Sequence, residues 1–304
     1  TGWRYLKDAL KKSNQVATLA ASPSYERHHG LFANPTRARL IRKLKRLDSK
    51  LEITDLRRAL AQMRVIKQPL EVAAIQKAID ITANGIEAVC SNLTNYKYES
   101  EIEAELSRYF RLNGADGHAF LPIVAGGKNA CTLHNIANNS KLNPGDLAVI
   151  DVGAEVDNYA ADITRTLAIG RVSKRQQQVY DAVLAAQNYA LELLKPGVDF
   201  KIYETKVGKF LGDRLVELKL IRGSSDRNAV TKYCPHATSH FLGLDVHDVG
   251  DYLQPLKANM VLTVEPGIYI PEEDIGVRIE DDVIITEGGN RILSRDLPRE
   301  LMLN

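Results

Sequence analysis

The sequence lacks several features that would identify whole classes of protein. No apolar run approaches the ~20 residues of a membrane-spanning helix, and the first residues do not have the pattern of a signal peptide. Charge of neither sign dominates, because 40 lysines and arginines oppose 38 aspartates and glutamates for a net charge of +2. Overall charge therefore gives no reason to expect a nucleic-acid or membrane partner.

Cysteine is scarce too. Cys90, Cys131 and Cys234 are odd in number and widely spaced, which argues against a disulfide framework and suits a reducing compartment. We therefore expect a cytoplasmic protein. The nucleotide-binding motif GxGxxG, the P-loop, short repeats and low-complexity tracts are all absent. The 304 residues are 44% hydrophobic and 26% charged, as in an ordinary globular enzyme.

Two parts are expected along the chain. Residues 1–66 are predicted to be a partial amino-terminal α/β domain whose start is missing, and residues 67–304 a larger second domain. In the first part, residues 36–47 are rich in arginine and lysine but carry leucine and isoleucine at helical spacing. An amphipathic helix with a solvated basic face explains this pattern better than a nucleic-acid patch.

Turn and cap signals predict long helices in the second part. Pro69 is placed to open one helix, and Ser100 with Glu103, like Ser173 with Gln176, has the spacing of a capping box. The other expected elements are a helix over 200–221 and strands near 120–125, 131–134, 147–154, 160–168, 241–245, 260–265, 268–270 and 277–286. Because long helices alternate with pairs of strands, we expect an α+β fold with a curved, mostly antiparallel sheet backed by helices.

The stretch AVIDVGAEVDNYAADITRT, residues 148–166, predicts a β-hairpin around the turn Asp157-Asn158. With those two residues as the loop, Asp151 lies opposite Thr164, and Asp151 and Asp162 share one face about 7–8 Å apart. Two inward-facing carboxylates are costly unless a cation compensates them. The alternative, an aspartate that faces solvent or caps a turn, stays open until other ligands are found.

Three histidines lie close together in HATSHFLGLDVHD, at His236, His240 and His247. If His240 begins a strand, His236 is a loop residue and His247 emerges near the far end of that strand. Each histidine alone would be a structural or surface residue, but the cluster favours chemistry.

Two glutamates follow in apolar surroundings. Glu265 ends an apolar strand before a Pro-Gly turn, and Glu280 is expected in the middle of a strand, where a buried carboxylate requires a partner. An ion pair with Arg278, which shares its face, is the simpler alternative to metal ligation. We favour metal ligation because the flanking residues are so apolar.

Together these residues supply four carboxylates and one imidazole. Such a set suits Mn²⁺, Co²⁺, Zn²⁺ or Fe²⁺, and four carboxylates can neutralise two divalent ions. With five ligands for two metals some carboxylates must bridge, which is the two-metal arrangement of aminopeptidases, in which a bridging water becomes hydroxide near neutral pH.

At this point the chain resembles a known family, the creatinase/methionine aminopeptidase-like "pita-bread" metallopeptidases, and within it the Xaa-Pro aminopeptidases (aminopeptidase P). The segments that carry the resemblance are DVGAEVDNYAADITRT, HATSHFLGLDVHDVG, TVEPGIYI and GVRIEDDVIIT. The resemblance spans residues 64–303 and implies that Asp151 binds one metal, that Asp162 and Glu280 bridge, and that His240 and Glu265 hold the other. Glu265 would also be the general acid/base.

The resemblance assigns four further residues. His134, in NACTLHN, matches a histidine near the substrate, and His236 and His247 match histidines that position the peptide or stabilise the tetrahedral intermediate. Arg278 resembles an arginine that pairs with an acidic residue beside the metals.

The function implied by this resemblance is hydrolysis of the bond between an amino-terminal residue and a following proline, by hydroxide bridging two divalent metals. Manganese is the expected metal, with cobalt, zinc or iron as alternatives, and the partners would be peptides with proline at the second position. The full-length form is expected to be a homo-oligomer, a dimer.

Two other functions remain open. A prolidase would use the same centre on Xaa-Pro dipeptides, although Ser239 before the ligand histidine, where prolidases more often have glycine, argues modestly against it. A non-catalytic peptide- or protein-binding module on the same fold, like creatinase-like members and pseudo-enzymes, would have lost metal ligands, and this chain keeps them. Methionine aminopeptidase is disfavoured by the amino-terminal segment and the sequence around His240.

Overall fold

The computed structural model describes residues 2–19 and 35–301. Its residues form two compact units, which divide between Met63 and Arg64. Each unit is described by itself.

The small unit pairs two parallel strands with helices. Its elements are α1 (Gly2–Leu10), β1 (Gln15–Thr18), α3 (Pro35–Leu47), β2 (Glu52–Asp55) and most of α4 (Arg57–Val65). Leu10, Leu44 and Leu51 form its core. In α3, Leu44 is buried while Arg42 and Lys43 are exposed, so the predicted amphipathic helix with a basic outer face is confirmed.

The large unit holds long helices and short antiparallel strands. Its helices are α5 (Pro69–Cys90), α6 (Glu99–Leu112), α7 (Lys174–Leu193), α8 (Phe200–Glu217) and α9 (Arg227–Tyr233), with 3-10 turns η1 (Leu93–Asn95), η2 (Gly127–Cys131) and η3 (Pro271–Glu273). Its strands are β3 (Gly117–His118), β4 (Ile123–Gly126), β5 (Leu147–Val152), β6 (Ala154–Val156), β7 (Tyr159–Ala160), β8 (Ile163–Ala168), β9 (Val261–Val264), β10 (Gly267–Ile270), β11 (Ile275–Arg278), β12 (Asp281–Thr286) and β13 (Gly289–Ile292).

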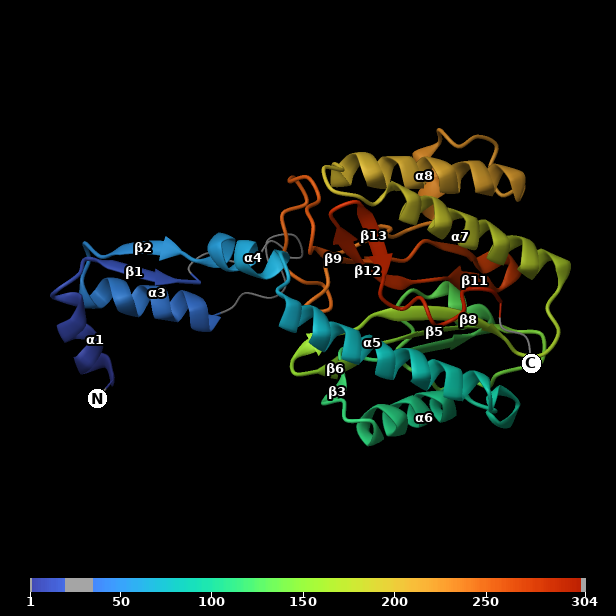
Figure 1. Cartoon of the computed structure of the whole chain (residues 1–304), viewed down its shortest axis with the longest axis horizontal. Helices are drawn as coiled ribbons and strands as arrows, with labels where there is room; N and C mark the ends of the chain where they lie inside the picture. Colours follow the sequence, from blue (N-terminus) through green and yellow to red (C-terminus); the bar gives the residue numbers. More distant parts are fainter. Residues whose placement is uncertain (1, 20–34, 302–304) are drawn as a thin grey trace. The chain divides into compact units, whose positions relative to one another are not determined.

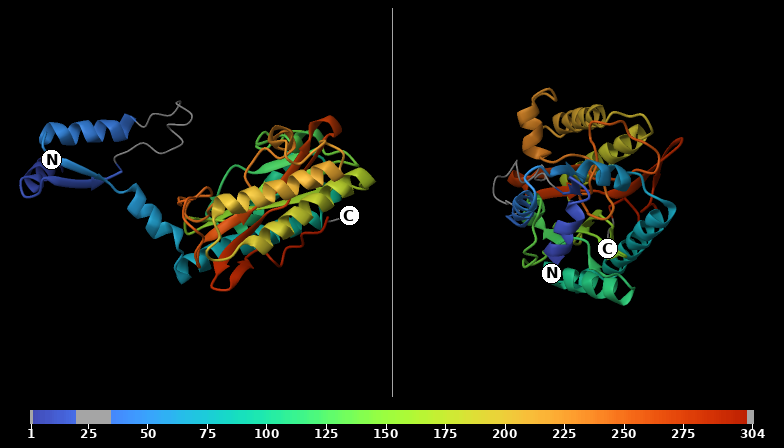
Figure 2. Two further views of the ribbon diagram at one scale, coloured as in Figure 1. Left: turned by 90° about the horizontal axis from the view of Figure 1, so that it is seen from above. Right: turned by 90° about the vertical axis from the view of Figure 1, so that its left-hand side faces the viewer.

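These elements form layers. The strands lie between α5 and α6 on one side and α7 and α8 on the other (Figure 1), and α7 and α8 run side by side (Figure 2). One apolar core packs α7 and α8 against β9–β12, and a second packs α5 and α6 against β5, β6 and β8. Every strand pair described in this unit is antiparallel. The strands form four small sheets instead of one continuous sheet, in the orders β10-β11, β13-β12-β9, β3-β6-β7 and β4-β5-β8.

The predicted hairpin has the expected register. β5 and β8 pair Asp151 with Thr164, and the ladder continues through β6 and β7 to the turn. Asp157 and Asn158 have positive φ angles of 52° and 67°, as a tight two-residue hairpin turn requires. Between the two ladders lies Gly153, where a Cβ atom would stand 1.7 Å from the carbonyl oxygen of Ala161. Only glycine fits at this crossing.

Other helix boundaries differ in part from the prediction. Pro69 opens α5, and Ser173 caps α7 through Gln176, as predicted. The prediction that Ser100 caps a helix with Glu103 was wrong. The cap is two residues earlier, at Tyr98, since α6 begins at Glu99 and the Glu101 carboxylate accepts the N–H of Tyr98.

The predicted helix over 200–221 ends earlier, at Glu217. Lys219 adopts a left-handed φ of 60°, and Leu220 donates its N–H back to the carbonyl of Leu215, which closes the helix. Residues 131–134 and 241–245 are not strands. The first follow η2 as irregular chain, and the second make a single β-bridge at Phe241.

Within the described ranges, no helix has the length and apolar character needed to cross a membrane.

Candidate metal centre

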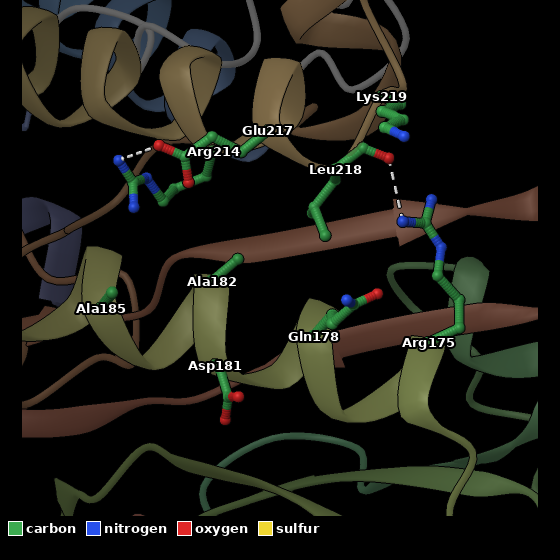
Figure 3. A pocket seen from close by; sticks show the side chains of 9 residues that line it. All are labelled: Arg175, Gln178, Asp181, Ala182, Ala185, Arg214, Glu217, Leu218 and Lys219. Carbon is green, nitrogen blue, oxygen red and sulfur yellow. Dashed lines mark hydrogen bonds and ion pairs between the residues drawn. The ribbon is translucent and has the colours of Figure 1, made fainter.

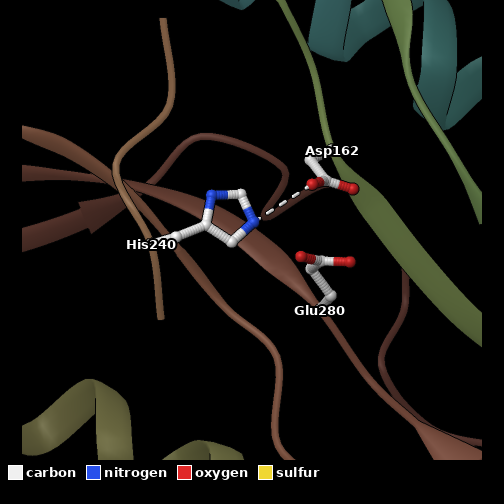
Figure 4. A group of neighbouring side chains, drawn as sticks. All are labelled: Asp162, His240 and Glu280. Carbon is white, nitrogen blue, oxygen red and sulfur yellow. Dashed lines mark ion pairs between the residues drawn. The ribbon is translucent and has the colours of Figure 1, made fainter. Parts of the chain in front are cut away.

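Three of the predicted metal ligands meet in the large unit. Asp162 lies just before β8, Glu280 between β11 and β12, and His240 in the irregular chain that precedes the bridge at Phe241. One ligand atom from each lies within 4.8 Å of the others (Figure 4). His240 Nε2 is 3.4 Å from an Asp162 carboxylate oxygen. The sequence predicted Glu280 in the middle of a strand, and this was wrong, because Glu280 lies between β11 and β12.

The other two predicted ligands border this group. Glu265, directly after β9, places Oε1 3.4 Å from His240 Nε2. Asp151 lies in β5 on the adjoining sheet and is 8% exposed. Its Oδ2 accepts a hydrogen bond of 2.6 Å from Arg278. The ion-pair partner of Arg278 is thus Asp151, and the simpler explanation of Glu280 as that partner is not what the structure shows.

Backbone and hydroxyl groups fix the carboxylates. The Thr164 hydroxyl donates to Glu280 Oε2 at 2.6 Å, and the Glu280 N–H donates to the Thr164 carbonyl at 3.0 Å. Asp162 donates its own N–H to the buried Asp282 carboxylate at 3.0 Å. The hairpin and the β11–β12 junction are therefore joined at the ligands themselves.

His240 is held from two sides. Its carbonyl accepts the N–H of Thr263 at 2.9 Å, and the Thr238 carbonyl accepts the N–H of Glu265 at 2.8 Å, so these two backbone hydrogen bonds hold both predicted ligands, His240 and Glu265. On the other side, the Glu204 carboxylate of α8 accepts the N–H groups of Thr238 and Ser239 at 3.0 and 3.1 Å. His240 Nδ1 lies 3.0 Å from the Phe241 carbonyl, which can only accept. In the neutral tautomer that donates from Nδ1 to this carbonyl, Nε2 has a lone pair that can bind a cation.

Three carboxyl groups of this cluster have raised pKa values. Burial, reinforced by Asp151 and Asp282, raises the pKa of Asp162 well above its usual value. Burial also raises the pKa of Glu280, with Asp162 as the next cause, and raises the pKa of Glu265 to about 7.

Two buried oxygens of the cluster, Asp151 Oδ1 and Glu280 Oε1, have no hydrogen-bond partner among the described residues. Unpaired buried carboxylate oxygens are costly, and divalent cations are the partners that carboxylates and a neutral imidazole share. The residues present therefore fit a metal centre.

The predicted catalytic histidines surround this cluster. His236 Nδ1 is 3.7 Å from Glu265, and the ring of His247 is 4.2 Å from that of His240. Burial lowers the pKa of both His236 and His247 to about 4, so both rings are neutral at pH 7. His134, exposed in the chain after η2, is close enough for its charge to lower both of those pKa values further.

The position of His247 was predicted wrongly. It does not emerge at the far end of a strand, because His240 does not begin one and residues 241–245 form only a single β-bridge, at Phe241. The chain turns after Gly243, and the Asp248 N–H closes the loop on the Phe241 carbonyl at 2.8 Å, which returns His247 to His240.

Sequence reasoning missed several residues that support the centre. The Tyr269 hydroxyl accepts from Arg278 at 2.7 Å and lies 2.8 Å from His236 Nε2, so it joins two predicted site residues. Thr164 could have been found, since it follows Asp162 by two positions and so shares its face of the strand. Glu204 and Asp282 support the site from other parts of the chain, and no local sequence pattern predicts these contacts.

Two cysteines near the site are not reactive groups. Burial raises the pKa of Cys131 to about 11 and that of Cys234 to about 12. Both are therefore thiols at neutral pH, as expected for small buried residues.

A surface pocket of about 450 Å³ lies between α7 and α8 (Figure 3). Arg175 there donates to the Leu218 carbonyl and pairs with Glu273, and Arg214 pairs with Glu217 at 2.6 Å. The pocket is lined by none of the predicted site residues.

The sequence model of Metallopeptidase family M24 matches residues 73–287, which include every predicted metal ligand. The chain belongs to metallopeptidase family M24. The expected pita-bread fold of that family is thereby confirmed.

Several relatives of this M24 chain are described as Xaa-Pro aminopeptidases or as aminopeptidase P. Over 268 residues it is 43% identical to the Xaa-Pro aminopeptidase of Haemophilus influenzae, covering 82% of this chain and 62% of that one. A structure described as a putative aminopeptidase P from Bacillus anthracis superposes with a TM-score of 0.88 at 33% identity, covering 99% of this chain and 71% of that one. Zn-substituted aminopeptidase P of E. coli, in complex with product, gives a TM-score of 0.82 at 31% identity, covering 97% and 72%. The M24 chain spans less than two thirds of the length of the curated relative.

Proposed function

We propose that this M24 chain is a metal-dependent exopeptidase that releases an amino-terminal residue preceding proline. The observation that carries the proposal is the convergence of Asp162, His240 and Glu280 from three distant segments, with Glu265 and Asp151 beside them. The described relatives are Xaa-Pro aminopeptidases and aminopeptidase P structures, which supports the same assignment.

The ligand set would hold two divalent cations. Asp151 would bind one, His240 and Glu265 the other, and Asp162 and Glu280 both. When bound, such ions supply water activated near neutral pH and polarise the scissile carbonyl. Manganese is the proposed metal, with cobalt, zinc and iron as alternatives, because oxygen-rich sets with one imidazole suit all four.

The protein's own side chains carry the proton and orient the substrate. Glu265 takes a proton from the attacking water and delivers it to the proline nitrogen as it leaves. His247 is neutral and can donate a hydrogen bond to the developing oxyanion, since its pKa is about 4. His134 and His236 position the peptide, and Arg278 holds Asp151 in place.

The requirements on the substrate site follow from the chemistry of the Xaa-Pro peptide bond. An Xaa-Pro peptide bond has no N–H, so a site for it cannot rely on that donor. The acidic cluster would receive the free α-amino group of the peptide, which accounts for exopeptidase action. We further propose a cytoplasmic location, supported by three free cysteines, and a homodimer in the full-length form.

The test compares an Xaa-Pro-Yaa tripeptide with an Xaa-Pro dipeptide, with Mn²⁺ and then with a chelator. Tripeptide cleavage abolished by the chelator is the expected result, while preference for the dipeptide would indicate a prolidase. Glu280→Ala should lose both metal and activity, whereas Glu287→Ala, an exposed glutamate of the same region, should lose neither. A metal-loaded, active Glu280→Ala protein would overturn the proposal.

A further inference from the structure

A buried ion pair lies behind the loop that carries His247. Lys67, just before α5, and Asp248, next to His247, place Nζ and Oδ2 3.0 Å apart, and both side chains are 1% exposed. Charged side chains are almost never buried to this extent unless they are paired. Neither residue has a part in the proposed chemistry.

The loop from His240 to Asp248 is attached to this pair at several points. Arg64 also donates to Asp248, and pairs with Asp245 at 2.6 Å. A Cβ atom on Gly243 would stand 2.2 Å from Asp248 Oδ2 and 2.9 Å from Lys67 Nζ, so the loop backbone lies directly against the two charges. The ion pair and the loop therefore form one packed unit.

Backbone hydrogen bonds also hold the loop, since the Ala160 N–H donates to the Gly243 carbonyl at 2.9 Å and the Asp248 N–H to the Phe241 carbonyl at 2.8 Å. His240 is held independently by Thr263 and by the Thr238–Ser239 segment on Glu204. Val246 packs against the second apolar core, whereas none of the backbone hydrogen bonds described for the loop involves His247 itself. Because His247 is the residue next to Asp248, the position of its ring, 4.2 Å from that of His240, also depends on how the Asp248 side chain is anchored.

We propose that Lys67 and Asp248 are positioning residues, whose buried ion pair holds His247 against the metal centre. The proposal rests on the proposed function for the role of His247, but the position of the ring can be measured without it. Removal of either charge would leave the loop to move, so that His247 no longer meets the developing oxyanion, while the predicted ligands His240 and Glu265 stay in place.

The test uses the full chain with Mn²⁺ and the variants Lys67→Met, Asp248→Asn and the pair Lys67→Met/Asp248→Leu. For each single variant we expect kcat to fall at least tenfold with metal content unchanged and KM changed less than kcat. Lys67→Arg, which keeps the charge, should retain more kcat than Lys67→Met. Arg175→Met, which breaks an ion pair on α7, is the control and should keep its kcat.

The double variant separates positioning from stability. Replacing both partners of a buried ion pair by apolar residues often restores stability. A positioning role predicts that the double variant regains its Tm but not its kcat. Recovery of both, or single variants with wild-type kcat, would overturn the proposal.

Crystal structures of the wild type and of Lys67→Met give a readout that does not depend on activity. We expect the separation of the His240 and His247 rings to increase in the variant. If the wild type cleaves neither peptide, the proposed function fails, and this separation alone decides the positioning role. An unchanged separation would refute it.

Discussion

Thr164→Val isolates the contribution of one hydroxyl group to the metal centre. The Thr164 hydroxyl donates to Glu280 Oε2 at 2.6 Å and accepts from Arg278 Nε at 3.2 Å, and the residue is fully buried. Valine keeps the shape of the side chain but removes the only hydrogen-bond donor on that Glu280 oxygen among the described contacts. A hydrogen bond to a charged group contributes about 1.5–3 kcal/mol.

The same magnitude is expected in metal binding. Loss of a group that orients a metal ligand typically lowers metal affinity by about 10–100-fold, which corresponds to about 1.4–2.8 kcal/mol at 25 °C. We therefore expect the Mn²⁺ dissociation constant of Thr164→Val, measured by competition with a chelator, to rise by that factor. Activity should recover at higher Mn²⁺ concentration, because every proposed ligand is still present.

Thr82→Val is the matched control. Thr82 is equally buried, and its hydroxyl also makes two hydrogen bonds, to the Ala78 carbonyl at 2.8 Å and from the Ala154 N–H at 2.9 Å. Both variants should lose about 1–3 kcal/mol of unfolding free energy, but only Thr164→Val should lose metal affinity. Unchanged affinity in Thr164→Val, or an equal loss in Thr82→Val, would refute this account of how Glu280 is held.

Two other predictions concern stability. In chelator-treated protein the folded-state pKa of Glu265 is about 7, above its unfolded value, so the stability it contributes is present below about pH 4.5 and is lost as the pH rises through 7. Urea titrations from pH 5 to 8 should therefore show the wild type losing stability relative to Glu265→Gln as the pH rises, and a flat difference would contradict the raised pKa. Gly153→Ala places a Cβ 1.7 Å from a backbone oxygen and should cost more than the ~1–3 kcal/mol of ordinary overpacking, whereas Gly288→Ala, with nothing within 4 Å, should be near neutral. Similar denaturation midpoints for the two alanine variants would disprove the steric argument.

The sequence was most informative where local patterns dominate. The hairpin register followed from the alternation of side chains and from one two-residue turn, so the pairing of Asp151 with Thr164 could be predicted. The capping box of Ser173 and Gln176 could be predicted for the same reason, since the two residues are only three positions apart. Ser100 and Glu103 have the same spacing, but the prediction from them was wrong. Glu101 accepts the N–H of Tyr98, so the helix is capped at Tyr98.

The parts that could not be predicted depend on contacts between distant segments. Apolar residues at 241–245 suggested a strand, but Gly243 packs against Lys67 and Asp248, and the chain turns away from its neighbour at Phe241. Arg278 could have paired with either Asp151 or Glu280 by proximity in a sheet, and only the packing of β11 beside β5 decides for Asp151. The support of His240 by Glu204 likewise depends on where α8 lies.

The separation of the proposed ligands along the chain has a consequence for biosynthesis. Asp151 and Glu280 are 129 positions apart (280 − 151), and each of Asp162, His240 and Glu265 comes from a different segment between them. No short piece of the emerging polypeptide can therefore assemble the centre, and contacts between such distant residues form late because long loops must first be closed. Metal uptake should thus begin only after β12 has left the ribosome and docked, so that the bound cation reports a completed fold.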